Sequence, residues 1–128
     1  MEKFDLYKCE ICGNIVEIIV NGNGELVCCG KPMQKLTAKN NEEAMMEKHI
    51  PIFVKKDDGR SEIRVGEVLH PMESEHHIVF IQAVSDDMSA SQIKFLNIND
   101  EPKMIIDNDY SYAKEYCNIH GLWEGKNA

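Results

Sequence analysis

The sequence predicts an all-β protein in which a small cysteine-rich module precedes an antiparallel β-sandwich. Two observations support this class. Short β-branched or alternating runs recur between turn signals over most of the chain. In addition, four of the five cysteines lie within residues 1–36, and all five histidines come later. This separation indicates two metal-binding modules. We predict a first module at residues 1–36, a linker at 37–43 and a second module at 44–128.

The first module contains one predicted hairpin. Residues 15–20 (IVEIIV) are apolar and rich in β-branched side chains, and residues 21–24 (NGNG) readily adopt the positive φ of a hairpin loop. Residues 25–27 (ELV) then form the expected returning strand. A module of this size buries too little surface to fold alone, so a bound metal has to stabilise it.

The second module contains a series of strand-like runs separated by turn signals such as residues 57–59 (DDG). Their spacing is typical of an antiparallel sandwich. The predicted strands are 51–56, 61–65, 76–84, 92–98, 103–106 and 110–117.

Charge and hydropathy restrict the partners. A net charge of -8 argues against nucleic acid or an anionic membrane as a partner, because such surfaces bind an excess of Lys and Arg. No window approaches the roughly 18 apolar residues of a membrane helix, and the segment MEKFDLYKCE lacks the pattern of a secretory signal. We therefore expect a cytoplasmic protein whose cysteines bind metal rather than form disulfides.

The cysteines of the first module have the spacing of a four-thiolate metal site. Cys9 and Cys12 form a Cys-x-x-Cys pair, and Cys28 and Cys29 are adjacent. A Cys-x-x-Cys turn lets two thiolates converge on one ion. Four thiolates suit zinc or iron, so the spacing alone leaves a structural zinc ribbon and an iron site equally open.

The second module holds the remaining candidate ligands. They are His49, His70, His76, His77, Cys117 and His120. A single histidine on a half-buried strand is more often structural than a ligand, but Cys117-x-x-His120 is a metal-binding spacing in its own right. Four imidazoles and one thiolate exceed zinc's tetrahedral preference and suit iron with one open position. A thiolate opposite that position would donate electron density toward a small oxygen species.

Five short motifs resemble a known family. YKCEICGN and CCGKPM resemble the N-terminal, desulforedoxin-like module of desulfoferrodoxins, while EKHIPI, HPMESEHH and EYCNIHGLW resemble the catalytic module of superoxide reductases. The resemblance implies an immunoglobulin-like sandwich of about seven strands. It also implies two non-haem irons per chain. Centre I would be held by Cys9, Cys12, Cys28 and Cys29, and centre II by His49, His70, His76 and His120 with Cys117 as axial ligand.

The choice of His76 over His77 rests on the resemblance, in which the second ligand follows the first by six residues. Strand alternation does not decide between them, because both faces of the following strand are apolar. The family motif is often HPMEEKHW, so Glu75 replaces a lysine and His77 a tryptophan. The change at Glu75 removes positive charge near the site.

The resemblance implies one-electron reduction of superoxide to hydrogen peroxide without release of dioxygen. It further implies a homodimer that receives electrons from rubredoxin or a similar small carrier. Glu47 and Lys48, directly before His49, match a Glu-Lys pair of the family. Lys48 would attract superoxide and organise water for proton delivery, although residue type alone favours two solvated charges. The alternatives are a non-catalytic electron carrier, a zinc-stabilised binding module and a superoxide dismutase.

Overall fold

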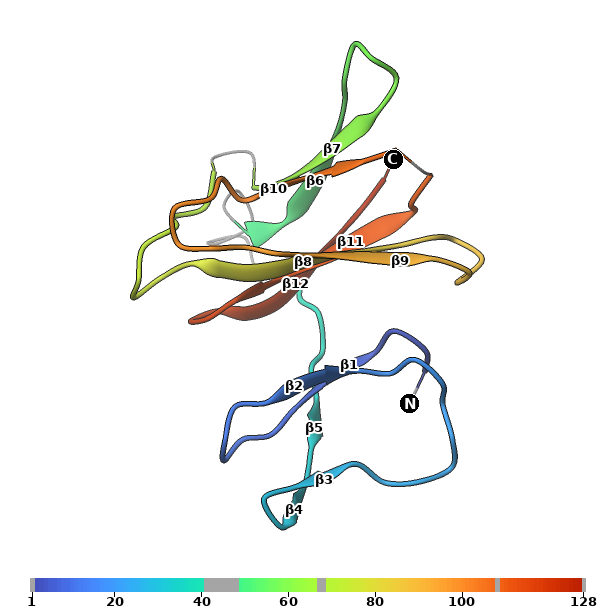
Figure 1. The fold of residues 1–128 in the computed structure, drawn as a ribbon, viewed down its shortest axis with the longest axis vertical. Helices are drawn as coiled ribbons and strands as arrows, with labels where there is room; N and C mark the ends of the chain where they lie inside the picture. The colour runs from blue at the N-terminus through green and yellow to red at the C-terminus, as the bar shows by residue number, and fades with distance from the viewer. Residues whose placement is uncertain (1, 41–48, 67–68, 108, 128) are drawn as a thin grey trace. The chain divides into compact units, whose positions relative to one another are not determined.

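The computed structural model describes residues 2–40, 49–66, 69–107 and 109–127 (Figure 1). The chain divides into two compact units, Met1–Thr37 and Ala38–Ala128, and each is described by itself. Both are built from β-strands, as the sequence predicts. Among the described residues, no helix has the length and apolar character needed to cross a membrane.

The first unit consists of two small antiparallel sheets. One has the strand order β2-β1-β5, and the other pairs β3 with β4. The strands are β1 (Leu6–Lys8), β2 (Ile15–Glu17), β3 (Val27–Cys28), β4 (Lys31–Pro32) and β5 (Gln34–Lys35). Phe4, Leu6 and Ile18 are buried and form a minimal apolar core.

The predicted hairpin between residues 15–20 and 25–27 is wrong. Strand β2 ends at Glu17 and pairs with β1, placing Tyr7 opposite Val16. The Cys9-x-x-Cys12 turn connects β1 to β2, and the Cys9 amide donates to the Asn14 carbonyl at 2.8 Å. The observed hairpin therefore forms around the cysteine turn and not around the Asn-Gly loop.

The second cysteine pair also occupies a hairpin turn. Cys29 and Gly30 connect β3 to β4, with Cys28 opposite Lys31. Both turn residues have positive φ, 55° at Cys29 and 76° at Gly30, which is the requirement of a two-residue type I′ turn. Each cysteine pair is therefore fixed by a tight turn of its own.

The second unit is a sandwich of a three-stranded sheet, β10-β7-β6, and a four-stranded sheet, β12-β11-β8-β9 (Figure 1). The paired strands are antiparallel throughout. The strands are β6 (Pro51–Lys55), β7 (Ser61–Val65), β8 (Ile78–Val84), β9 (Ser91–Phe95), β10 (Lys103–Ile106), β11 (Tyr112–Cys117) and β12 (Gly121–Lys126). Each of the six strands predicted in this unit corresponds to one of β6 to β11.

Strand β12 was not predicted, because Gly121 and Gly125 interrupt its apolar pattern. It pairs with β11 along its whole length, from Cys117 opposite Gly121 to Tyr112 opposite Lys126.

The core of this unit lies between the two sheets. Its members are apolar side chains with at most 4% exposure. They are Ile63, Val65, Ile78, Ile81, Ala83, Met104, Ile106, Tyr110, Ala113 and Cys117. Cys117 is the one candidate ligand in this cluster of described residues, so the core continues directly into the site.

Gly125 lets β12 approach the start of β6. A Cβ atom here would overlap the Pro51 carbonyl oxygen and lie 3.1 Å from Cγ2 of Ile50. We predict that Gly125→Ala destabilises the protein by about 1–3 kcal/mol, the usual cost of overpacking, and lowers the melting temperature by several degrees. Gly22→Ala is the matched control, because no neighbouring atom lies within 4 Å of its Cβ position. Equal melting temperatures for the two variants in thermal unfolding would contradict this close approach.

Candidate metal centres

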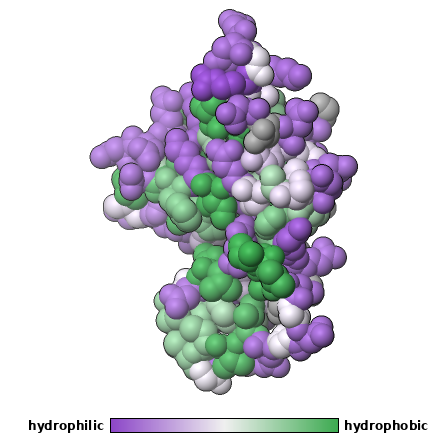
Figure 2. Space-filling view, turned by 45° about the vertical axis from the view of Figure 1, so that its right-hand side comes forward, coloured by the Kyte–Doolittle hydropathy of each residue, from purple (hydrophilic) through white to green (hydrophobic). Residues whose placement is uncertain are grey.

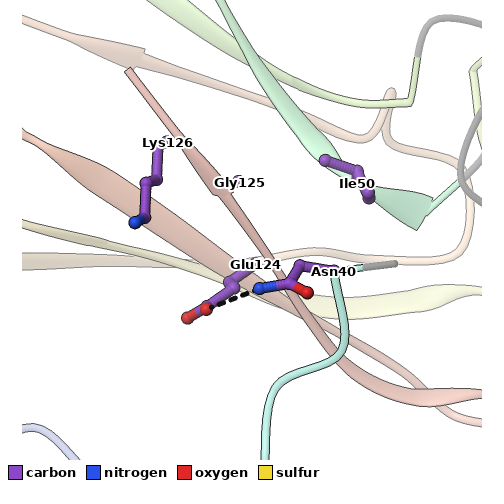
Figure 3. Close-up of a pocket in the computed structure, with 5 residues that line it drawn as sticks. All are labelled: Asn40, Ile50, Glu124, Gly125 and Lys126. Carbon is purple, nitrogen blue, oxygen red and sulfur yellow. Dashed lines mark hydrogen bonds between the residues drawn. The ribbon is translucent and has the colours of Figure 1, made fainter. Parts of the chain in front are cut away.

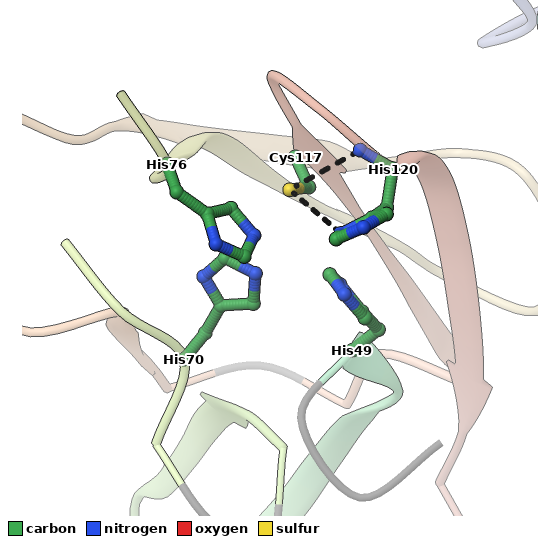
Figure 4. A group of neighbouring side chains, drawn as sticks. All are labelled: His49, His70, His76, Cys117 and His120. Atoms are coloured by element: carbon green, nitrogen blue, oxygen red, sulfur yellow. Dashed lines mark hydrogen bonds between the residues drawn. The ribbon is translucent and has the colours of Figure 1, made fainter. Parts of the chain in front are cut away.

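Three segments of the second unit bring five donor side chains together. His49 precedes β6, His70 and His76 lie in the connection from β7 to β8, and Cys117 and His120 flank the turn from β11 to β12. Figure 4 shows the five side chains directed toward one another. One donor atom from each residue lies within 4.8 Å of all the others.

The four imidazoles are arranged as a square. Neighbouring ring centroids are 4.6 Å apart for His49–His70, 4.5 Å for His70–His76, 5.0 Å for His76–His120 and 4.8 Å for His49–His120. The His49–His76 diagonal is longer, at 6.3 Å. Metal–ligand bonds of about 2.0–2.3 Å place opposite donors at most about 4.6 Å apart, close to the observed spread. The group therefore fits one ion with five protein ligands.

Burial favours the neutral imidazoles that metal binding requires. His49 and His70 are only 2% and 3% exposed. Burial lowers the pKa of His49 to about 3, and positive charge at the other histidines and at Lys39 acts in the same direction. Burial raises the pKa of the Cys117 thiol, partly countered by the backbone amides of His120 and Ile119. A cation among these donors would supply the charge that lets Cys117 lose its proton.

Hydrogen bonds orient two of the imidazoles. His70 Nδ1 lies 2.8 Å from the Pro71 carbonyl oxygen, which can only accept. Nδ1 therefore carries the proton, and Nε2 is the donor atom left for the centre. His120 directs Nδ1 toward Cys117 Sγ, 3.9 Å away.

The structure brings His76 into the group and leaves His77 outside it. His77 Nδ1 lies 2.9 Å from the Glu73 carbonyl oxygen and donates to it. The backbones of Glu73 and His76 exchange two hydrogen bonds, at 2.9 and 3.1 Å. This tight turn fixes which of the two imidazoles faces the centre.

Two residues that were not predicted to have a functional role lie against the His49 imidazole. Trp123 is fully buried and stacks on His49 with centroids 4.8 Å apart and planes 13° apart. Its Nε1 donates to the His120 carbonyl at 3.2 Å. Glu115 is also fully buried, with Oε1 3.6 Å from His49 Nδ1. Burial raises the pKa of Glu115 well above its ordinary value, while burial lowers the pKa of His49.

Asn118 links two ligand-bearing segments. Its Oδ1 accepts from the His77 amide at 2.8 Å, and its Nδ2 donates to the Glu75 carbonyl at 3.0 Å. Its backbone amide donates to the His77 carbonyl at 3.1 Å. The turn that holds Cys117 and His120 is thereby fixed to the segment that holds His76.

The four cysteines of the first unit form the second group, with donor atoms within 4.8 Å of one another. Two sulfur–sulfur distances set the size of the group: Cys12 Sγ lies 3.6 Å from Cys28 Sγ, which lies 4.0 Å from Cys29 Sγ. A tetrahedral ion with metal–sulfur bonds of about 2.3 Å places its sulfurs about 3.8 Å apart. All four cysteines are free thiols. The arrangement therefore fits one ion and no disulfide.

The thiols of this group perturb one another. The Cys12 backbone amide, 3.4 Å from Cys9 Sγ, lowers the pKa of Cys9 to about 6. A hydrogen bond with the Cys12 thiol instead raises the pKa of Cys28 to about 12. Four thiolates can coexist at this spacing only with a cation between them.

Glu47 and Lys48, the predicted residues beside His49, lie outside the described residues.

The fold and the two donor sets define a β-sheet protein with two mononuclear metal centres, one of four cysteines and one of four histidines and a cysteine. The family model of the desulfoferrodoxin N-terminal domain matches residues 1–36, and that of desulfoferrodoxin matches residues 41–126. The chain belongs to the desulfoferrodoxin family. It accordingly carries two non-haem irons, one for each donor set.

Individual relatives agree with this assignment. A desulfoferrodoxin of Desulfarculus baarsii is 44% identical over 128 residues, covering 98% of each chain. A superoxide reductase of Pyrococcus horikoshii is 34% identical over 98 residues, covering 62% of this chain and 85% of its own. In fold, the superoxide reductase of Treponema pallidum superposes with a TM-score of 0.73 at 23% identity, covering 98% of this chain and 100% of its own.

We predict that Asn118→Ala weakens iron binding in the five-donor group by about 10–100-fold, the usual effect of losing an outer hydrogen-bonding partner. The variant loses both side-chain bonds to residues 75–77. Iron retained during titration with a chelator measures the change. Asn97→Ala removes an exposed asparagine from another loop and serves as the control. Equal retention in both variants would show that Asn118 does not hold the ligand segments together.

Proposed function

We propose that the protein is a superoxide reductase. It combines one superoxide, one electron and two protons into one hydrogen peroxide, with no release of dioxygen. The observation that carries this proposal is the square of four imidazoles with a thiol as fifth donor. Iron readily takes six ligands, so a ferrous ion held by these five donors could also bind a small molecule and would supply the electron.

The histidines and the cysteine of the five-donor group have different roles. His49, His70, His76 and His120 would hold the ion through neutral nitrogens. Cys117 would contribute negative charge that favours electron donation. The His120 amide, 3.4 Å from Cys117 Sγ, limits that charge by hydrogen bonding. Trp123 and Glu115 keep the His49 ring in place.

Glu47 and Lys48 belong to this proposal as the residues that precede His49 in the chain. Lys48 attracts the anionic substrate and organises water for proton delivery. Glu47 is the acidic member of this Glu-Lys pair.

The electron donor is a small one-electron carrier such as rubredoxin, because each turnover consumes one electron. We place the reaction in the cytoplasm, where thiols stay reduced. The five free cysteines support that compartment.

A homodimer forms through the first unit. Apolar side chains gather on its surface, as Figure 2 shows. They include Val16, Ile19, Val20 and Val27, of which Val20 is 84% exposed and Ile19 62%. They border an apolar groove that also reaches Leu26 and Met33. A second copy of the chain would cover this surface.

We predict that Val20→Asp shifts the dimer to monomer, because a charge in a buried apolar interface is costly. Sedimentation equilibrium measures the change, with both irons retained. Phe95→Asp is the control, since Phe95 is 74% exposed but lies in the second unit. A wild-type chain that is monomeric at all concentrations would refute the dimer.

The function is tested by a pulse of superoxide mixed with the reduced protein. We expect one peroxide per superoxide when a donor is supplied. A dismutase yields one peroxide per two superoxides and evolves dioxygen, and a carrier or zinc module yields neither product. Cys117→Ser should change the iron spectrum and slow the reaction, because the thiolate is lost. An unchanged spectrum and rate in that variant would exclude Cys117 as a ligand.

A further inference from the structure

Lys39 is held beside the five-donor group by its backbone. Its amide donates to the Leu122 carbonyl at 2.9 Å, and its carbonyl accepts from the Glu124 amide at 2.9 Å. These bonds form a parallel bridge between Lys39 and Trp123. The next residue, Asn40, donates to Glu124 Oε1 at 3.3 Å (Figure 3). A segment predicted as linker therefore runs along β12 with a fixed register.

The side chain of Lys39 reaches the centre from this position. Its Nζ donates to the His120 carbonyl at 3.2 Å. The same ammonium lies 5.4 Å from the centroid of the Trp123 ring, a cation–π distance. Trp123 in turn stacks on His49. The positive charge of Lys39 therefore lies on the side of the five-donor group where His49 and His120 are found.

Charge at this edge matters because the chain as a whole repels anions. Its net charge is -8, and Glu75 adds an acidic residue to the segment that bears His76. The amide of Glu124 is bound to the Lys39 carbonyl, and its carboxylate Oε1 accepts from the Asn40 side chain. The ammonium of Lys39 is bound to a carbonyl and a ring, so its charge is not cancelled by a carboxylate in either contact.

We propose that Lys39 is a substrate-attracting residue, a cationic group that draws superoxide to the five-donor centre. This inference rests on the proposed function and deepens it. Lys39 does not touch the reacting atoms in this role. It raises the local concentration of a small anion through its field.

Coulomb's law sets the size of the effect. Over a distance on the order of 8 Å in water, one unit charge changes the local concentration of a monovalent anion by about a factor of two. Removing the charge should therefore slow superoxide capture about twofold, and reversing it about fivefold. The effect should fade with salt, because the Debye length falls from about 30 Å at 0.01 M to about 3 Å at 1 M.

The experiment compares the iron-loaded wild type with Lys39→Arg, Lys39→Gln and Lys39→Glu. Arginine keeps the charge, glutamine keeps a hydrogen-bond donor without the charge, and glutamate reverses the charge. Lys56→Gln is the control. Lys56 follows the far end of β6, whereas His49 precedes its start, so this variant removes a lysine that is separated from His49 by the whole strand. The readouts are the rate constant with superoxide and the affinity of the oxidised protein for azide, each at low and high salt.

We expect wild-type values for Lys39→Arg and Lys56→Gln. Lys39→Gln should show about twofold and Lys39→Glu about fivefold losses in both readouts at low salt, with convergence at high salt. Losses that persist at high salt, or that Lys39→Arg shares, would overturn the inference in favour of a structural role. Equal values for all variants would overturn it as well. If the wild type fails to reduce superoxide, the proposed function fails, and the azide series still decides whether Lys39 attracts anions.

Discussion

The convergence of five donors at one end of the sandwich is the constraint on which the second unit depends. His49, His70 and Cys117 are each at most 3% exposed, so their polar atoms have given up most contact with water. An ion that binds one donor atom from each of the five side chains replaces part of that lost contact, so metal binding contributes directly to folding.

The sandwich supplies the rigidity that this convergence needs. The pairing of β11 with β8 shifts between Tyr116 and Cys117, and such an irregularity can redirect a side chain. Gly121, at φ 82°, then allows the sharp return into β12. The same strand brings Trp123 beneath His49 and approaches β6 closely at Gly125. Strand β12 therefore positions both the Trp123 ring beside His49 and the start of β6, which follows His49.

Much of the molecule could be predicted from local patterns. Cys9-x-x-Cys12 and Cys117-x-x-His120 are short spacings whose chemistry needs no knowledge of the fold, and alternation located six strands of the sandwich. Contacts between distant segments could not be predicted this way. Strand β12 contains two glycines and shows no clear alternation of apolar and polar residues. In the first unit, the hairpin forms at the cysteine turn and not at the predicted Asn-Gly loop. The roles of Glu115, Asn118 and Lys39 depend on tertiary contacts with residues distant in sequence, which no local pattern predicts.

Mössbauer spectroscopy of protein enriched in iron-57 tests the central claim most directly, because it counts irons by their coordination. Two components of equal area are expected in the reduced protein. One should have the parameters of a ferrous ion with four sulfur ligands, and the other those of a five-coordinate ferrous ion with mainly nitrogen ligands. A spectrum with only the four-sulfur component, from protein that carries its full metal content, would contradict an iron centre in the square of histidines.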